Sequence, residues 1–283
     1  MRNKYNSDYW EKRISAEVWN SYNTLEEKNI KLIEEYRKAT ERLQLELLKE
    51  LTELETNKTR TQKYKVERLK SLKYNFEQEL NRLTARIEKT TNKNFAKECI
   101  NIYKQALNIT LPLFSQNEDQ YTMTNDELIQ FLNENTFNGK NFKEYIWGDT
   151  EKLQDELDQI LKNGLMKGES VASMSYKINN AMNKGLNVAY RLIRTESIHY
   201  LNESAIKGYE NAGVKYVQWW CAEDERTCPR CGAIHGKIFK IGENPTTQHP
   251  NCRCTVIPVI DMKTAKEDYK TAQEEIRKIQ KTA

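Results

Sequence analysis

The first third of the chain carries apolar residues at a helical spacing. Residues 8–89 contain no Gly or Pro and are rich in Glu, Lys, Leu and Arg, a composition that favours helix. In two successive segments the apolar residues recur every three or four positions, which predicts two helices packed along a narrow seam. The two sets are Ile30, Ile33, Tyr36, Leu43, Leu47, Leu51 and Leu54, and then Val66, Leu69, Leu72, Phe76, Leu80, Leu83 and Ile87.

A polar run at residues 56–59 separates the two segments. The break predicts a long antiparallel hairpin, and a single bent helix is the alternative, because no Gly or Pro fixes a turn. We therefore expect residues 1–95 to form a helical arm, either a hairpin or a coiled-coil-like structure. Trp10, Trp19 and Tyr22 would be exposed on this arm, where an apolar stripe could dock on a helical partner.

Residues 96–185 are predicted to be a helical region of shorter elements. Pro112, Asn138-Gly139, Gly164 and Gly168 mark turns between them, because Gly and Pro interrupt regular structure. Thr124 and Glu127 have the spacing of a capping box at the start of a helix. Gly164 is expected to cap the helix that carries Leu153 and Leu161.

Residues 186–261 are predicted to form a small α+β domain. A helix over 188–211 ends at Gly213, and three segments rich in β-branched and aromatic residues follow, at 214–220, 237–241 and 254–260. Such segments favour strands. Residues 262–283 are polar and form a helical or disordered tail. The expected fold is therefore mainly α, with a small C-terminal α+β domain.

The cysteines are concentrated in that domain. Five of the six lie between residues 221 and 254, where a C-x-x-C turn is followed by His-Pro-Asn-Cys-Arg-Cys. No secretory start or membrane-spanning run is present, and in a reducing cytosol such a cluster more often binds metal than forms disulfides. Two short turns that each present Cys or His donors are typical of a tetrahedral zinc site. The candidate ligands are Cys228, Cys231, His249, Cys252 and Cys254.

Five donors compete for four positions around the zinc. The sequence leaves open which of Cys252 and Cys254 binds, whether the metal is zinc or iron, and whether the thiols are simply reduced and metal-free. We expect zinc in a closed structural site that stabilises a domain with a small core. The alternative of a zinc-dependent hydrolase or nuclease would need an open metal position beside a general base, for which Glu196 and Asp224 are the candidates. We expect no enzymatic activity.

Charged residues suggest two further features. Arg194 and Glu196 lie on the helix before the first strand and are predicted to form a structural ion pair that holds this helix to the metal loop. The net charge is only +4, but basic residues gather in two places that could contact DNA phosphates. The alternative is a solvated helix face with local ion pairs. The candidates for DNA contact are Arg60, Lys63, Lys65, Lys70, Arg230 and Arg253.

The C-terminal motifs resemble those of the phage head morphogenesis proteins related to protein F of phage Mu. The matching segments are Arg194-Thr195-Glu196, residues 224–231, Gly236 and residues 249–254, while residues 8–13 resemble the start of phage minor capsid proteins. The resemblance implies a minor capsid protein of a tailed phage or prophage that associates with the portal and acts in procapsid assembly and DNA packaging or delivery. It implies no catalytic residue.

The same resemblance sets expectations for location and partners. The protein would be made in the bacterial host cytoplasm and incorporated into the virion, in the head interior or at the portal vertex. Its partners would be the portal protein and other head proteins, with non-specific DNA binding and homo-oligomer formation as further candidates and no membrane contact. Some relatives carry an appended toxin or ADP-ribosyltransferase domain. About 22 residues follow the last predicted strand, so we expect no such domain in this chain.

Overall fold

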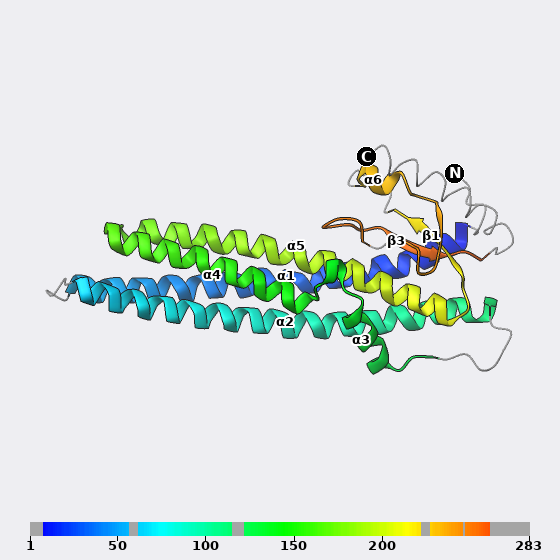
Figure 1. Cartoon of the computed structure of the whole chain (residues 1–283), viewed down its shortest axis with the longest axis horizontal. Coiled ribbons are helices and arrows are strands. Elements are labelled where there is room, and N and C mark those ends of the chain that lie inside the picture. Colours follow the sequence, from blue (N-terminus) through cyan, green and yellow to red (C-terminus); the bar gives the residue numbers. More distant parts are fainter. Residues whose placement is uncertain (1–7, 57–61, 115–121, 222–226, 246, 261–283) are drawn as a thin grey trace. The chain divides into compact units, whose positions relative to one another are not determined.

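The computed structural model describes residues 8–56, 62–114, 122–221, 227–245 and 247–260 (Figure 1). Long helices dominate, and the strands are short and confined to the C-terminal region, as the sequence predicts. The elements in chain order are α1 (Asp8–Thr56), α2 (Gln62–Phe114), α3 (Asn125–Glu134), the 3-10 turn η1 (Phe137–Gly139), α4 (Phe142–Lys167), α5 (Val171–Asn211), β1 (Tyr216–Trp220), α6 (Pro229–Gly232), β2 (Ile238–Lys240) and β3 (Thr255–Pro258).

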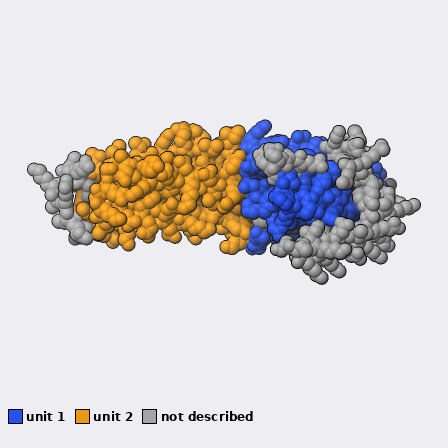
Figure 2. Space-filling view, turned by 90° about the horizontal axis from the view of Figure 1, so that it is seen from above, with its two compact units in different colours: residues 1–27, 93–139, 194–283 blue, residues 28–92, 140–193 orange. Residues whose placement is uncertain are grey.

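The chain divides into two compact units, each assembled from separate stretches of sequence (Figure 2). The helical unit comprises residues 28–92 and 140–193, and the mixed unit comprises residues 1–27, 93–139 and 194–283. Helices α1, α2 and α5 run through both units. None of the helices in the described part of the chain is both long and apolar enough to cross a bilayer.

The helical unit is a bundle of four helix segments. Hydrogen bonds join α1 to α5 (Gln44 Nε2 to the Ser175 carbonyl oxygen, 3.2 Å) and α2 to α4 (Lys73 Nζ to Asp158 Oδ2, 2.7 Å). Helices α4 and α5 are likewise linked by a hydrogen bond between a lysine and a glutamate side chain. The four segments lie side by side in Figure 1, so each buries its apolar stripe between two neighbours.

Helices α1 and α2 pair in antiparallel order within this unit. Arg42 donates to Glu79 at 2.7 Å and Asn75 donates to Glu46 at 2.6 Å. As the residue numbers rise along α1, the numbers of the facing residues on α2 fall, so the two helices run antiparallel. This arrangement confirms the predicted hairpin and excludes the single bent helix.

The buried face of α1 differs in part from the predicted one. Tyr36, Leu43 and Leu47 are buried as expected, but Ile30 and Ile33 are 61% and 50% exposed. The prediction was wrong for these two, because Ile30 and Tyr36 are six positions apart and so lie on different sides of a helix with 3.6 residues per turn. Val66, predicted for the seam of α2, is also 41% exposed. The residues of α1 that line the seam within the unit are Leu32, Tyr36, Ala39, Leu43 and Leu47.

Two predicted helix ends also lie elsewhere. Helix α2 continues through Pro112 to Phe114, which places the proline in its last turn. Gly164 was predicted to cap α4 but is buried inside it, and Gly168 is the cap, with φ 68°. The left-handed conformation that ends a helix is favoured by Gly, and here the second of two available glycines adopts it. The Thr124–Glu127 capping box is confirmed in both of its hydrogen bonds.

The mixed unit places a three-stranded antiparallel sheet beside the end of α5. The strand order is β2-β1-β3, with Val217 opposite both Phe239 and Pro258. Val217 and Trp219 in the central strand are fully buried. Helix α5 ends where Gly213, at φ 89°, turns the chain into β1. All three strands fall within the ranges predicted from their apolar and β-branched residues.

Candidate metal centre

The first pair of cysteines is presented by the short helix α6. Cys228 caps its N-terminus, and Pro229 occupies the first helical position, where its missing N–H costs nothing. The backbone N–H of Cys231 donates to Cys228 Sγ at 3.3 Å. The Cys-Pro-Arg-Cys sequence thus forms a tight turn that brings two sulfur atoms to one side.

The second ligand turn is formed by residues 249–252. The backbone N–H of Cys252 donates to the His249 carbonyl oxygen at 3.1 Å, and Asn251 has φ 61°. Pro at the second position and a left-handed residue at the third are the features of a type II turn, and Asn tolerates that conformation. The Asn251 N–H donates to Thr195 Oγ1 at 3.0 Å, which anchors the turn to α5.

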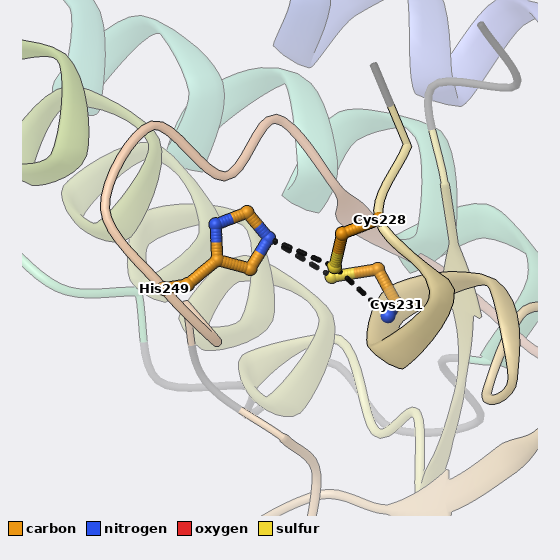
Figure 3. Close-up of side chains that lie close together, drawn as sticks. All are labelled: Cys228, Cys231 and His249. Atoms are coloured by element: carbon orange, nitrogen blue, oxygen red, sulfur yellow. Dashed lines mark hydrogen bonds between the residues drawn. The ribbon is translucent and has the colours of Figure 1, made fainter. Parts of the chain in front are cut away.

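The two turns bring three donor atoms together (Figure 3). His249 Nε2 lies 3.3 Å from Cys228 Sγ and 3.4 Å from Cys231 Sγ. Zinc–sulfur bonds of about 2.3 Å and zinc–nitrogen bonds of about 2.0 Å give tetrahedral edges of about 3.5 Å between nitrogen and sulfur. The observed distances therefore fit a zinc ion bound between these side chains.

The tautomer of His249 also suits a metal ligand. Its Nδ1 lies 2.9 Å from the Pro250 carbonyl oxygen, and a carbonyl can only accept a hydrogen bond. Nδ1 must carry the proton in this contact, which leaves the lone pair of Nε2 directed toward the two sulfurs. A second hydrogen bond of this kind commonly orients histidine ligands.

A second cluster shares Cys231 with the first and contains both remaining candidates. The sulfur atoms of Cys231, Cys252 and Cys254 lie within 4.8 Å of one another, and Cys231 and Cys252 are 3.9 Å apart. That distance is close to the sulfur–sulfur edge of about 3.8 Å expected for tetrahedral zinc. The five candidate ligands therefore form two clusters joined by Cys231, with Cys252 and Cys254 in the second.

Cys221 joins this cluster, although the sequence analysis left it out of the ligand set. Its sulfhydryl donates to the Cys231 carbonyl oxygen at 3.1 Å, and its N–H donates to His235 Nδ1 at 3.1 Å. A hydrogen bond from Cys254, with a weaker one from His235, lowers the pKa of the Cys221 thiol. His235 is half-buried and contacts the Trp220 ring, with centroids 4.7 Å apart. The concentration of cysteines was the available signal for Cys221.

The start of α1 supports the ligand loop. Trp19 Nε1 donates to the Arg253 carbonyl oxygen at 3.1 Å, and Asn202 Nδ2 of α5 donates to the Cys254 carbonyl oxygen at 2.9 Å. Tyr22 is only 3% exposed. The prediction that these side chains are exposed was therefore wrong for Tyr22, while Trp19 is half-buried. The side chain of Trp10 lies outside the described residues.

The predicted ion pair between Arg194 and Glu196 is not formed. Arg194 Nε lies 3.2 Å from Glu26 Oε2 and donates to the Tyr22 hydroxyl at 3.1 Å. Glu196 is fully buried, and neither carboxylate oxygen has a hydrogen-bond partner among the residues that the structure describes. Burial raises its pKa to about 8. Residues two positions apart point to different sides of a helix, so Arg194 holds α5 to α1 instead.

A cleft of about 270 Å³ opens beside the ligands. Glu196 is not among its lining residues, and none of the described residues that line it carries a carboxylate, while Asp224 lies outside the described part of the chain. A hydrolytic zinc site needs a general base beside an open metal position, and the described lining does not supply a carboxylate base. The lining residues are Arg194, Thr227, Cys228, Cys231, His249, Pro250, Asn251, Arg253 and Cys254.

The basic residues considered for DNA contact have varied surroundings. Arg230 is exposed on α6, and Arg253 is half-buried at the cleft. Within the basic stretch of α2, Lys70 is exposed and Lys65 is half-buried. Arg60 and the side chain of Lys63 lie outside the part of the chain that the structure describes. The neighbouring Arg68 forms an ion pair with Glu50 at 2.7 Å, so the local ion pairs expected on a long helix account for that residue.

Comparison with known proteins matches the C-terminal part of the chain to a protein family. Residues 155–257 match the family described as Phage Mu protein F like protein, which covers the metal centre and the sheet. The chain is also 26% identical, over 89% of its length, to a protein of Enterococcus faecalis named NAD(+)--arginine ADP-ribosyltransferase EFV.

The chain spans 55% of that relative, so the transferase activity in its name is a property of that protein. No solved structure matches the chain. The family match includes the cysteine and histidine motifs from which the resemblance was predicted. Residues 155–257 are therefore similar to the Phage Mu protein F like family, which supports the resemblance predicted from the sequence.

Proposed function

We propose that this chain is a minor capsid protein of a tailed phage or prophage, and that zinc fixes its C-terminal domain. It would associate with the portal and act in procapsid assembly and in DNA packaging or delivery, without catalysing a reaction. The observation that carries the proposal is the coincidence of the family match with the Cys228, Cys231 and His249 geometry. The zinc would serve to hold the domain in shape.

Several features of the domain support a structural role for the metal. The sheet has three short strands, and two of them, β2 and β3, adjoin the loops that carry the ligands. A core this small gains much of its folding free energy when a metal joins distant loops. We propose Cys252 as the fourth ligand, because its sulfur lies at a tetrahedral edge distance from Cys231. Cys254 would then pack against Cys221 behind the metal.

The first test is metal content, measured by elemental mass spectrometry on the purified chain. We expect about one zinc per chain, and loss of both the zinc and the C-terminal fold in Cys228→Ser and His249→Ala. Cys99→Ser, a buried cysteine outside the cluster, is the matched control and should keep its zinc. A well-folded chain that contains no metal would refute the structural role of zinc.

The capsid role requires a separate test. The chain should co-purify with procapsids when it is expressed together with the portal and major capsid proteins of the same phage. The amount incorporated should fall when the portal is omitted. Incorporation that does not depend on the portal would refute the proposed association, whatever the metal content.

Non-specific DNA binding is a second candidate function. Exposed Arg230 and the Arg253 side chain at the cleft are the observation that favours it, because guanidinium groups suit phosphate contacts. Affinity for duplex DNA should then fall linearly with the logarithm of salt concentration, and Arg230→Gln should reduce that slope by about one. Absence of binding at low salt would eliminate this candidate.

A further inference from the structure

Helix α1 exposes four large apolar side chains on the side opposite its buried seam. Ile30, Ile33, Leu45 and Leu48 are 61%, 50%, 65% and 48% exposed. All four lie within the helical unit, where the other face of α1 packs against the bundle. Large exposed aliphatic residues that gather on one face of a helix are typical of a contact surface.

The four residues form one continuous stripe with two charged residues between them. At 100° per residue, Ile30, Arg37, Glu41 and Leu48 fall within about 20° of a common line along the helix. Ile33 and Leu45 flank this line by about 60° on opposite sides. We call these six residues, Ile30, Ile33, Arg37, Glu41, Leu45 and Leu48, the α1 stripe.

The α1 stripe is palindromic about position 39. Ile30 and Leu48 are each nine residues from that position, Ile33 and Leu45 are each six residues away, and Arg37 and Glu41 are each two residues away. In an antiparallel pair of identical stripes centred on this position, each aliphatic residue meets an aliphatic residue. Each Arg37 meets a Glu41 of the other copy.

We propose that a second copy of this chain packs antiparallel along the α1 stripe, with the twofold axis at the height of position 39 along the helix. A twofold interface requires a surface that is complementary to itself, so that residue i of one copy meets residue j of the other and j meets i. The stripe satisfies this condition for both its apolar and its charged residues. Ile33 and Leu45 lie on opposite edges of the stripe, so in the antiparallel pair they stand at the same height on opposite sides of the contact line.

The charges favour a second copy over a polyanion. Arg37 and Glu41 are about half exposed and form an ion pair within the chain, and Glu34 and Lys38 bind in the same group. The four charges sum to zero, so this face offers no positive potential to attract DNA. Between two copies, the same groups can exchange partners without leaving a charge unpaired.

The contact is long but narrow. Eighteen residues separate the ends of the stripe, about 27 Å along a helix. The groove that runs beside Leu45 on α1 and Tyr74 on α2 has a volume of about 540 Å³, and the 61% exposed Tyr74 extends the apolar surface. A single helix pair lies at the low end of the area found in stable interfaces. The dimer should therefore dissociate on dilution.

Sedimentation velocity of the full zinc-loaded chain over a range of concentrations tests the proposal. We expect a reversible monomer–dimer equilibrium that Leu45→Lys weakens at least about tenfold, since it places a charge in the apolar contact twice per dimer. Tyr176→Ser removes a 69% exposed aromatic residue from α5, outside the α1 stripe, and should leave the equilibrium unchanged. A wild-type chain that remains monomeric, or a dimer that Leu45→Lys leaves intact, would overturn the proposal.

Charge exchange tests the antiparallel register itself. Arg37→Glu and Glu41→Arg should each weaken the dimer, because each places like charges opposite one another. The double exchange should restore the wild-type equilibrium. Circular dichroism of each variant would check that α1 remains helical. Failure of the double exchange to restore dimerisation would refute this register. The proposal does not depend on the metal centre, so it can fail while zinc content and incorporation into heads remain as proposed.

Discussion

Gly208 on α5 packs tightly against α2 in the mixed unit, and replacing it with alanine should destabilise that unit. An added Cβ would lie 2.7 Å from the Ala106 Cβ and 2.7 Å from the Tyr103 carbonyl oxygen. Neither atom can rotate away, because one is fixed to the backbone and the other belongs to it. The two helices would have to separate.

The magnitude follows from two opposing effects. Alanine stabilises a helix by about 1 kcal/mol relative to glycine, while overpacking a tight contact costs about 1–3 kcal/mol. Because the neighbours here are backbone and a Cβ, the upper part of that range applies, and Gly208→Ala should lower the free energy of unfolding by about 1–2 kcal/mol.

Two other helical glycines provide matched controls. At Gly148 no atom lies within 4 Å of an added Cβ, so alanine should stabilise α4 by about 1 kcal/mol. At Gly164 the nearest atoms belong to the flexible side chain of Met174, so the gain and the cost should nearly cancel. Calorimetric unfolding of the three variants measures these differences. If Gly208→Ala proved as stable as Gly148→Ala, the close packing of α5 on α2 would be wrong.

Four further substitutions test the candidate metal centre and the buried charges. Cys252→Ser should abolish zinc binding by elemental analysis whereas Cys254→Ser should retain it, and the reverse result would assign the fourth position to Cys254. The pKa of the Glu196 carboxyl group is raised from 4.5 to about 8. The folded chain therefore holds this proton more tightly than the unfolded chain, and the resulting stability is lost as the pH rises from 4.5 to about 8, by about 1.4 kcal/mol per pH unit. Urea unfolding from pH 4.5 to 8 should therefore show a weaker pH dependence in Glu196→Gln, and an unchanged profile would place the titration elsewhere. Arg68→Ala should lower the unfolding free energy by about 2 kcal/mol, because Glu50 retains a side chain only 5% exposed and loses its charged partner; a loss below about 0.5 kcal/mol would show that water replaces the arginine.

Features that depend on neighbouring residues were predictable from the sequence. The capping box needs only Thr124 and Glu127, and the type II turn at Pro250 and Asn251 satisfies its own hydrogen bond. The ligand spacing of the Cys228–Cys231 turn is equally local. In each case the geometry is set by residues that lie within four positions of one another, so the sequence of that short segment is enough to predict it.

The partners of buried polar groups were not predictable in this way. Arg194 contacts Tyr22 and Glu26, which precede it by about 170 positions, and no local pattern distinguishes them from Glu196. The same holds for Trp19, whose indole contacts the backbone of Arg253. Such pairs follow from how α1 and α5 pack, which depends on the summed burial of many side chains.

The sequence alone determined the helical character of the chain, the three short strands and the set of thiol and imidazole donors, because these follow from local propensity, periodicity and spacing. Only the tertiary structure decided which face of α1 is buried and that Cys221 joins the thiol cluster. It also decided that the Glu196 carboxylate has no hydrogen-bond partner among the described residues. When apolar and polar residues are not sharply separated around a helix, the sequence is compatible with burying any of several faces of that helix. The choice among them is made by the packing of neighbouring helices, whose positions no local segment of the chain encodes.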